Sequence, residues 1–406
     1  MPSRCSPKVA GAASFKVCFL ISHMGARHSN MGTPAAAGPT PARVAALSFL
    51  CALLLIAGAA GGFAQEQAGQ SFEELSAQAA AARDRGDVPK AIDLYNRATQ
   101  LKPDWDEGWW YLTLLQYSSN QFPGAIDAAN HLLSLVPHAV PAMALRGLSE
   151  FETADYPSSL RDLETAVEHG GASDPHNEQI IRYHLALVLA RESRFQDALE
   201  QYKALATKGV SDPELLVGLG LAGMRVTSFP SEIADQDKAV YQAAGTAGYA
   251  FLAGDTDQAD TLFQQVLARY PTTARLHLFY GVLLFSHDPG LAADQFRDEG
   301  VIMPNDAAVR ALLAYALVIA GRYTEALPEA QRVYAAAPEM EMAQLALGRS
   351  LGETGDVEGG VAMLEKVLKT DPDNLEAHIG LAALFAREGR RDDAYRERML
   401  CLKLAK

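Results

Sequence analysis

The sequence predicts an all-α, right-handed solenoid of tandem pairs of antiparallel helices. A small residue returns along the chain at a nearly fixed interval, and six of the eight intervals are 34 residues or one fewer. A proline follows 12 residues after most of these positions. A fixed period of this length is typical of helical-repeat proteins. The repeating small residues are Ala91, Ala125, Ser159, Ala198, Ala259, Ala292, Ala326, Gly360 and Ala394.

One unit shows why the pattern predicts paired helices. Apolar residues spaced three and four apart over 344–351 predict a first helix with one buried stripe. Gly355 suits the left-handed turn that ends this helix, and Pro372 cannot continue the second helix that begins at Val357. The small residue, here Gly360, is expected where two helices cross closely. One such hairpin cannot bury its own stripe, so stacked neighbours must stabilise one another.

These positions resemble the tetratricopeptide repeat (TPR) family. In the second unit the matching residues are Trp109, Leu112, Phe122, Ala125, Leu132 and Pro137, and in the first they are Leu75, Ala79, Gly86, Ala91, Tyr95, Ala98 and Pro103. The resemblance covers residues 72–406. It implies nine recognisable units plus one degenerate unit, and the nine begin near Phe72, Asp106, Val140, Gln179, Val240, Thr273, Ala307, Glu341 and Leu375.

The rhythm breaks most strongly between Ala198 and Ala259. We interpret residues 211–238 as a degenerate repeat and loop between an N-terminal subarray, 72–210, and a C-terminal subarray, 239–406. Its first helix should run from 213 to 226, weakened by three glycines at 218, 220 and 223. Ser231 could then cap the next helix. The alternatives are simple repeat decay, or a hinge or partner-specific loop that exposes Phe229 and Pro230.

Composition and charge are typical of a folded soluble protein, and the acidic charge would tolerate a basic partner. The 406 residues include 49 acidic and 35 basic side chains, which gives a net charge of −14. All the acidic residues follow residue 64. Nucleic-acid phosphates would be repelled by such a chain, so nucleic-acid binding is disfavoured.

The N-terminal region predicts export. Arg43 precedes an apolar run over 44–60, and Gly62-Phe63-Ala64 offers a small-x-Ala cleavage site. We therefore expect residues 31–64 to be a signal peptide cut after Ala64, which places the chain in the periplasm or outside the cell. The alternative is an uncleaved signal anchor, with the chain held at the membrane facing outward. Residues 1–30 are expected to be a mis-called translation start or a disordered extension.

No residue pattern predicts catalysis, a metal site or a cofactor. The histidines show no metal-ligand or catalytic spacing, and those at 184, 277 and 378 fall on first helices, where hydrogen-bonded packing is expected. Cys401 is the one cysteine within the repeats, so it cannot build a cluster there. The chain has no Gly-rich phosphate loop and no nucleophile elbow. We expect a protein that is not an enzyme.

The family resemblance implies where a protein or peptide would bind. In TPR arrays the ligand contacts come from the second, fifth, ninth, twelfth and thirteenth places of each first helix, which line the concave surface. Here those places give Trp110, Leu114, Tyr117, Phe151, Tyr183, Tyr241, Phe251, His277, Tyr315 and Arg349. Aromatic side chains are good interface anchors.

Two features qualify this prediction of a groove. The set lacks the Lys and Asn residues with which some TPR domains clamp a terminal carboxylate, so that mode is disfavoured. Inter-helix packing is the alternative for each ring, above all for Phe151 and Phe251. The groove interpretation is favoured for Trp110 and Tyr117, because Trp109 and Leu112 already occupy the packing places.

Together these features predict an exported, non-enzymatic scaffold that binds another protein in its concave groove, in an envelope or secretion process. The alternatives are an accessory subunit of an enzyme complex and a membrane-tethered array. The last helix, which includes Asp392, Arg396, Arg398 and Lys403, is more polar than its predecessors. A capping helix with a polar outer face is therefore expected there.

Overall fold

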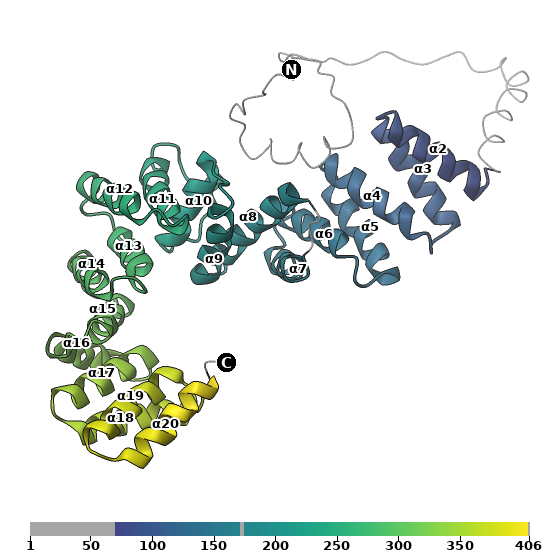
Figure 1. The fold of residues 1–406 in the computed structure, drawn as a ribbon. Helices are drawn as coiled ribbons and strands as arrows, with labels where there is room; N and C mark the ends of the chain where they lie inside the picture. Colours follow the sequence, from purple (N-terminus) through teal and green to yellow (C-terminus); the bar gives the residue numbers. More distant parts are fainter. Residues whose placement is uncertain (1–69, 171–173, 405–406) are drawn as a thin grey trace, which may run out of the picture. The chain divides into compact units, whose positions relative to one another are not determined.

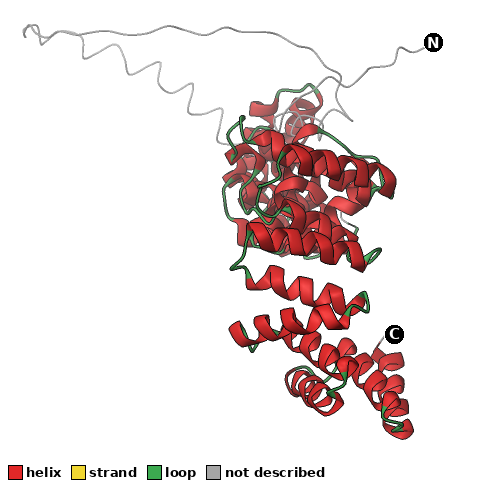
Figure 2. Ribbon diagram, turned by 90° about the vertical axis from the view of Figure 1, so that its left-hand side faces the viewer, coloured by secondary structure: helices red, strands yellow, loops and turns green. Residues whose placement is uncertain are grey.

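In the computed structural model, residues 70–170 and 174–404 are described, and this part of the chain contains only helices, turns and loops (Figures 1 and 2). It comprises 19 α-helices and one 3-10 turn, and consecutive helices pack as antiparallel pairs. The predicted all-α repeat fold is therefore confirmed. No helix among the described residues is both long enough and apolar enough to cross a membrane.

The chain divides into two compact units, and the division falls between Leu185 and Ala186 in the sequence of helix α8. The first unit contains α2 (Phe72–Asp84), α3 (Val88–Leu101), α4 (Asp106–Ser118), α5 (Phe122–Leu135), α6 (Val140–Glu152), α7 (Tyr156–Glu168) and the first part of α8 (Pro175–Arg191).

The second unit contains the rest of α8 and the helices that follow it. They are α9 (Phe195–Ala206), α10 (Pro213–Gly223), the 3-10 turn η1 (Pro230–Glu232), α11 (Lys238–Leu252), α12 (Thr256–Arg269), α13 (Leu276–Leu284), α14 (Pro289–Ile302), α15 (Ala307–Ile319), α16 (Tyr323–Ala336), α17 (Glu341–Thr354), α18 (Val357–Thr370), α19 (Leu375–Arg387) and α20 (Arg391–Leu404).

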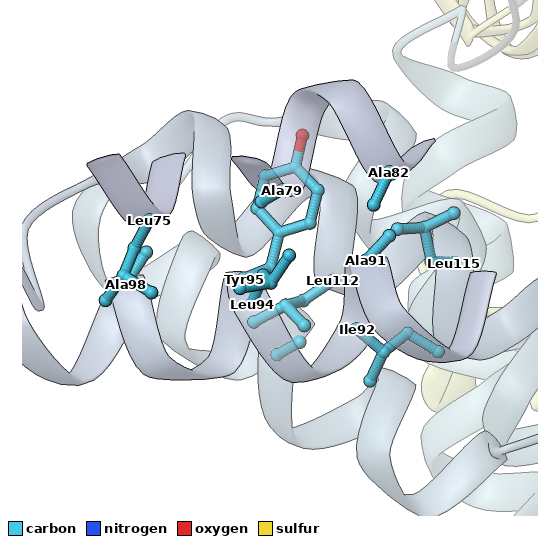
Figure 3. Close-up of a cluster of buried hydrophobic side chains, with 11 residues drawn as sticks. Leu75, Ala79, Ala82, Ala91, Ile92, Leu94, Tyr95, Ala98, Leu112 and Leu115 are labelled. Atoms are coloured by element: carbon cyan, nitrogen blue, oxygen red, sulfur yellow. The ribbon is translucent and has the colours of Figure 1, made fainter. Parts of the chain in front are cut away.

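The first hairpin, α2–α3, shows how the sequence sets each repeat. Ser71 begins α2 with a capping box that it shares with Glu74. Gly86, with φ of +75°, occupies the left-handed region where the chain turns into α3. Leu75, Ala79 and Tyr95 then close a core to which α4 also contributes (Figure 3).

The small residues lie at the hairpin crossings, as predicted. All nine are buried, and Ala394 of the last hairpin is only 3% exposed. Ser159 fits because its hydroxyl donates to the carbonyl of Gly147 at 2.7 Å, across the α6–α7 crossing. A β-carbon at Gly360 would lie 2.7 Å from the carbonyl oxygen of Gly348. A larger side chain at these places would push the two helices apart.

Helix α10 is the first helix of the predicted degenerate unit, and it has no second helix of its own. It packs instead on α11. Glycine makes this pair possible: a β-carbon at Gly220 would lie 1.9 Å from the carbonyl oxygen of Tyr241, and one at Gly245 would lie 1.8 Å from that of Leu216. The glycines were expected only to weaken the helix. They also permit a backbone approach that no larger residue allows.

The segment between α10 and α11 contradicts two expectations. Phe229 is 6% exposed and Pro230 is buried, so neither is presented to solvent. The guanidinium of Arg191 lies 4.8 Å from the centre of the Phe229 ring and pairs with Glu232 at 2.8 Å. Ser231 lies within η1, and α11 begins seven residues later at Lys238, so Ser231 does not cap it.

The predicted N-terminal extension, 1–30, and signal peptide, 31–64, lie outside the described residues. The proposed subarray boundaries, 72–210, 211–238 and 239–406, stay a prediction. The final helix corrects another expectation. Tyr395, Met399, Leu400 and Leu402 of α20 are 63%, 46%, 39% and 61% exposed, so its outer face is not uniformly polar.

Candidate protein-binding surface on the first helices

The ten predicted groove residues separate into two groups by burial. Tyr117 is 5% exposed and Tyr183 is 6% exposed, so both are buried. The other eight side chains are half-buried: Trp110, Leu114, Phe151, Tyr241, Phe251, His277, Tyr315 and Arg349. Only the half-buried group can offer surface to a partner.

Tyr117 corrects the expectation that it lines the groove. Its ring meets that of Phe122, from the second helix of the same hairpin, edge to face with the centres 6.0 Å apart. Burial raises the pKa of its hydroxyl. The ring at this place therefore joins α4 to α5. Tyr183, on α8, similarly packs edge to face with His184.

Three further residues take part in packing or internal hydrogen bonds. Phe151 contacts the rings of Tyr156 and His184, with centres 5.9 and 4.9 Å apart. Phe251 packs edge to face on His287 at 5.3 Å. A ring nitrogen of His277 lies 2.8 Å from the side-chain oxygen of Gln295. These contacts agree with the packing alternative, although each side chain keeps part of its surface.

Tyr315 and Arg349 lie in one side-chain cluster within the second unit. The Tyr315 ring on α15 stacks on that of Phe285, which ends α13, with the centres 5.8 Å apart and the planes 14° apart. The carboxylate of Glu376 on α19 lies near its hydroxyl. Burial, and then this carboxylate, raise the pKa of Tyr315. The cluster thus joins α13, α15 and α19.

Arg349, on the intervening helix α17, completes the cluster. A terminal nitrogen of its guanidinium lies 3.5 Å from the hydroxyl of Tyr323. Its Nε is buried and has no hydrogen-bond partner within the described residues. The side chain runs over Gly380, where a β-carbon would come within 2.7 Å of the Arg349 Cδ. We call Phe285, Tyr315, Tyr323, Arg349 and Glu376 the Tyr315–Arg349 cluster.

One exposed residue beside this cluster escaped the sequence analysis. Ile319, one helical turn after Tyr315 on α15, is 41% exposed. It occupies the thirteenth place of its first helix, which is among the places that the resemblance implies. An isoleucine at this place suggests a buried packing residue, so its exposure was not predictable from residue type.

In the first unit the sequence reasoning also missed a buried acid. Glu150 on α6 is 8% exposed, and burial is the main reason that its pKa rises to about 7. Asp162 raises it further, whereas Arg146, 3.9 Å away, lowers it. Arg146 bonds more closely to Asp162, at 2.5 Å. Glu150 therefore titrates near neutral pH.

The described residues contain no group of three or more His, Cys, Asp or Glu side chains that could hold a metal ion. The histidines on first helices serve packing. A ring nitrogen of His184 lies 2.8 Å from the carbonyl of Ile180, and those of His378 lie 2.5 Å from Glu397 and 3.0 Å from the carbonyl of Pro372. A cavity of about 370 Å³ lies between the start of α9 and the end of α10, and none of the predicted groove residues lines it.

Stacked helical hairpins define a helical-repeat protein. Family models described as tetratricopeptide repeat match residues 144–213, 246–273, 286–341 and 351–397. The chain is a tetratricopeptide repeat protein.

A curated relative is a TPR repeat-containing protein of Methanocaldococcus jannaschii, which is 22% identical over 341 residues. The match covers 79% of this chain and 54% of the relative, so the chain spans about half the length of that protein.

Among solved structures, residues 41 to the end of MamA from Desulfovibrio magneticus RS-1 are 19% identical, cover 42% of this chain and 96% of that one, and give a TM-score of 0.36. YrrB, described as a TPR protein with an unusual peptide-binding site, is 16% identical. The match covers 42% of this chain and 89% of YrrB, with a TM-score of 0.34. A chain of the APC/C hetero-tetramer Cut9-Hcn1 is 16% identical. The match covers 84% of this chain and 67% of that chain, with a TM-score of 0.34. These scores are too low to carry an argument about function.

Proposed function

We propose that this protein is a non-enzymatic scaffold that binds a segment of another protein on its first helices. The observation that carries the proposal is the Tyr315–Arg349 cluster, which brings partly exposed aromatic rings and a guanidinium together from the first helices α13, α15, α17 and α19 and from the start of the second helix α16. Tyrosine and arginine supply much of the affinity at protein interfaces, because they combine a large contact area with directional hydrogen bonds.

The exposed neighbours indicate what kind of segment would fit. Ile319 offers an aliphatic contact beside the half-buried Tyr315 ring. The half-buried Arg349 side chain offers a positively charged guanidinium with several N–H donors. A segment with one apolar side chain and one carboxylate or carbonyl acceptor nearby would use both features.

The experiment compares partner recovery by affinity purification from cells that produce the protein. Ile319→Ser combined with Arg349→Met should reduce recovery of a specific partner roughly tenfold, since each removes a contact at the centre of the surface. Val301→Ser is the matched control, because Val301 is an aliphatic residue, 79% exposed, on the second helix α14. Equal recovery by the double variant and the control would contradict the proposal.

Export belongs to the same proposal. It rests on the apolar run over 44–60 and the cleavage site at Ala64. The scaffold would then act in an envelope or secretion process. Mass spectrometry of the exported protein should find Gln65 at its N-terminus. A mass that retains residues 44–60, with the protein in the membrane fraction, would favour the tethered array instead.

A further inference from the structure

The outer face of α20 carries an apolar stripe that no described residue covers. Tyr395, Met399 and Leu402 are spaced four and three residues apart, so they lie on one side of the helix. Their exposed fractions are 63%, 46% and 61%. The opposite side is the packed one: Ala394 is 3% exposed, and Glu397 bonds to His378 of α19 at 2.5 Å.

The preceding repeat shows that residues at equivalent places pack against the next helix of the array. Residues 361 and 368 of α18 precede 395 and 402 by one 34-residue period. Val361 and Leu368 pack against the core that includes Leu381, Leu384 and Phe385 of α19. A second helix of this array therefore uses these two places to hold the following first helix. On α20 the same two places carry Tyr395 and Leu402.

The charges beside the stripe restrict which helix can cover it. In a heptad frame, with Tyr395 and Leu402 at d and Met399 at a, the flanking e and g places hold Arg391, Arg396, Arg398 and Lys403. Arg396 is paired with Asp393. Arg391 and Arg398 form no ion pair within the described part of the chain. Asp392, one turn before Tyr395, is the acidic residue in line with the stripe.

This arrangement disfavours two possible occupants. Pairing α20 with α20 of a second copy would oppose basic flanks, which is destabilising. The chain before residue 65 contains basic residues and no acidic ones. That segment would also meet like charge.

We propose that α20 is a second docking surface, which binds an amphipathic helix with acidic flanks from a partner protein. The apolar stripe supplies the buried contact, and the basic flanks select the partner by charge. This surface is separate from the first helices, so it does not depend on the function proposed above.

The test uses two synthetic three-heptad peptides with Leu at a and d. One carries Glu at e and g, and the other carries Lys there. Fluorescence anisotropy should show that the Glu peptide binds the full chain, and that Tyr395→Asp with Leu402→Asp weakens its binding roughly tenfold or more. Val301→Asp, another change at an exposed apolar residue, should leave it unaltered. Circular dichroism checks that all variants remain helical.

Charge reversal provides the decisive arm. Arg391→Glu with Arg398→Glu leaves two acidic and two basic residues on the flanks, so it should abolish the preference for the Glu peptide over the Lys peptide. The proposal is overturned if both peptides bind equally to the original chain, or if the stripe variants bind as well as the control. It is also overturned if sedimentation finds a dimer that Leu402→Asp dissociates, or if the Glu peptide binds only after residues 1–64 are removed.

Discussion

The α2–α3 hairpin and the α10–α11 pair both pack two helices closely, but with different residues at the crossing. In α2–α3, alanines at 79 and 91 bring the helices together, and the Tyr95 ring fills the space beside them. In α10–α11, glycines at 220 and 245 let each helix approach the backbone carbonyls of the other. The first arrangement leaves room for a β-carbon at the crossing. The second does not, so it should tolerate substitution far less.

The largest effect is expected from Gly245→Ala. Its β-carbon would meet a backbone oxygen, which cannot rotate away as a side chain can. We expect a loss of about 3 kcal/mol in the free energy of unfolding, measured by denaturant titration of the helical circular dichroism signal. An unchanged midpoint would show that the two helices are further apart than described.

Substitution at the crossing of the regular α2–α3 hairpin should cost less stability. Ala91 has no exposed surface and belongs to the core cluster that includes Leu75, Ala79 and Tyr95. Ala91→Leu should cost about 2 kcal/mol through overpacking. The same titration checks it, and a cost above that of Gly245→Ala would reverse the comparison.

A third prediction concerns the buried carboxyl of Glu150 within a regular hairpin. Because the pKa of Glu150 is raised to about 7 in the folded state, the folded chain holds a proton that the unfolded chain releases near its ordinary value. Stability from this group is full at low pH and falls as the pH rises through 7. Glu150→Gln should therefore stabilise the protein by about 1–2 kcal/mol at pH 8 and by less at pH 5. A variant with the same benefit at both pH values would contradict this assignment.

The segment after α10 should contribute a smaller amount. Arg191 holds it through contact with the buried Phe229 ring and an ion pair with Glu232, and the Arg191 and Glu232 side chains are 33% and 41% exposed. Arg191→Met should cost about 1 kcal/mol and increase proteolysis between 226 and 238. Cleavage equal to that of the original chain would show that burial of Phe229 holds the segment alone.

The smallest effect is expected at Gly300, a helix glycine that contrasts with Gly245. Gly300 lies inside α14, and a β-carbon there would meet nothing within 4 Å. Gly300→Ala should stabilise the protein by about 0.5–1 kcal/mol, because alanine favours the helix and loses less entropy on folding. The sign should thus differ between two glycine-to-alanine changes in helix interiors. Destabilisation at both positions would remove packing as the explanation.

The same contrast shows how far sequence reasoning reaches. The 34-residue period predicted the nine hairpins, because each small residue and proline acts within its own unit. The roles of Gly220 and Gly245 were not predictable, since the partner backbone comes from a helix more than 20 residues away. The burial of Phe229 was not predictable for a related reason. Its contact with Arg191 depends on the path of the chain after the interrupted repeat.

The candidate surface shows the same division. The family pattern placed Tyr315 and Arg349 on first helices, and the structure brings them into one cluster. The pattern could not distinguish them from Tyr117, whose burial depends on the Phe122 ring of the next helix. Nor did the pattern predict the apolar stripe on α20, because this helix is rich in charged residues and its few apolar side chains lie among them.

Photo-crosslinking tests most directly the central claim, that first helices bind the partner. The photoreactive residue p-benzoylphenylalanine would replace Ile319 on the first helix α15 or Val301 on the second helix α14, both exposed aliphatic positions. We predict partner crosslinks from position 319 and none from position 301, after irradiation of cells that produce the protein. Crosslinks from position 301 alone, or equally from both, would contradict the claim.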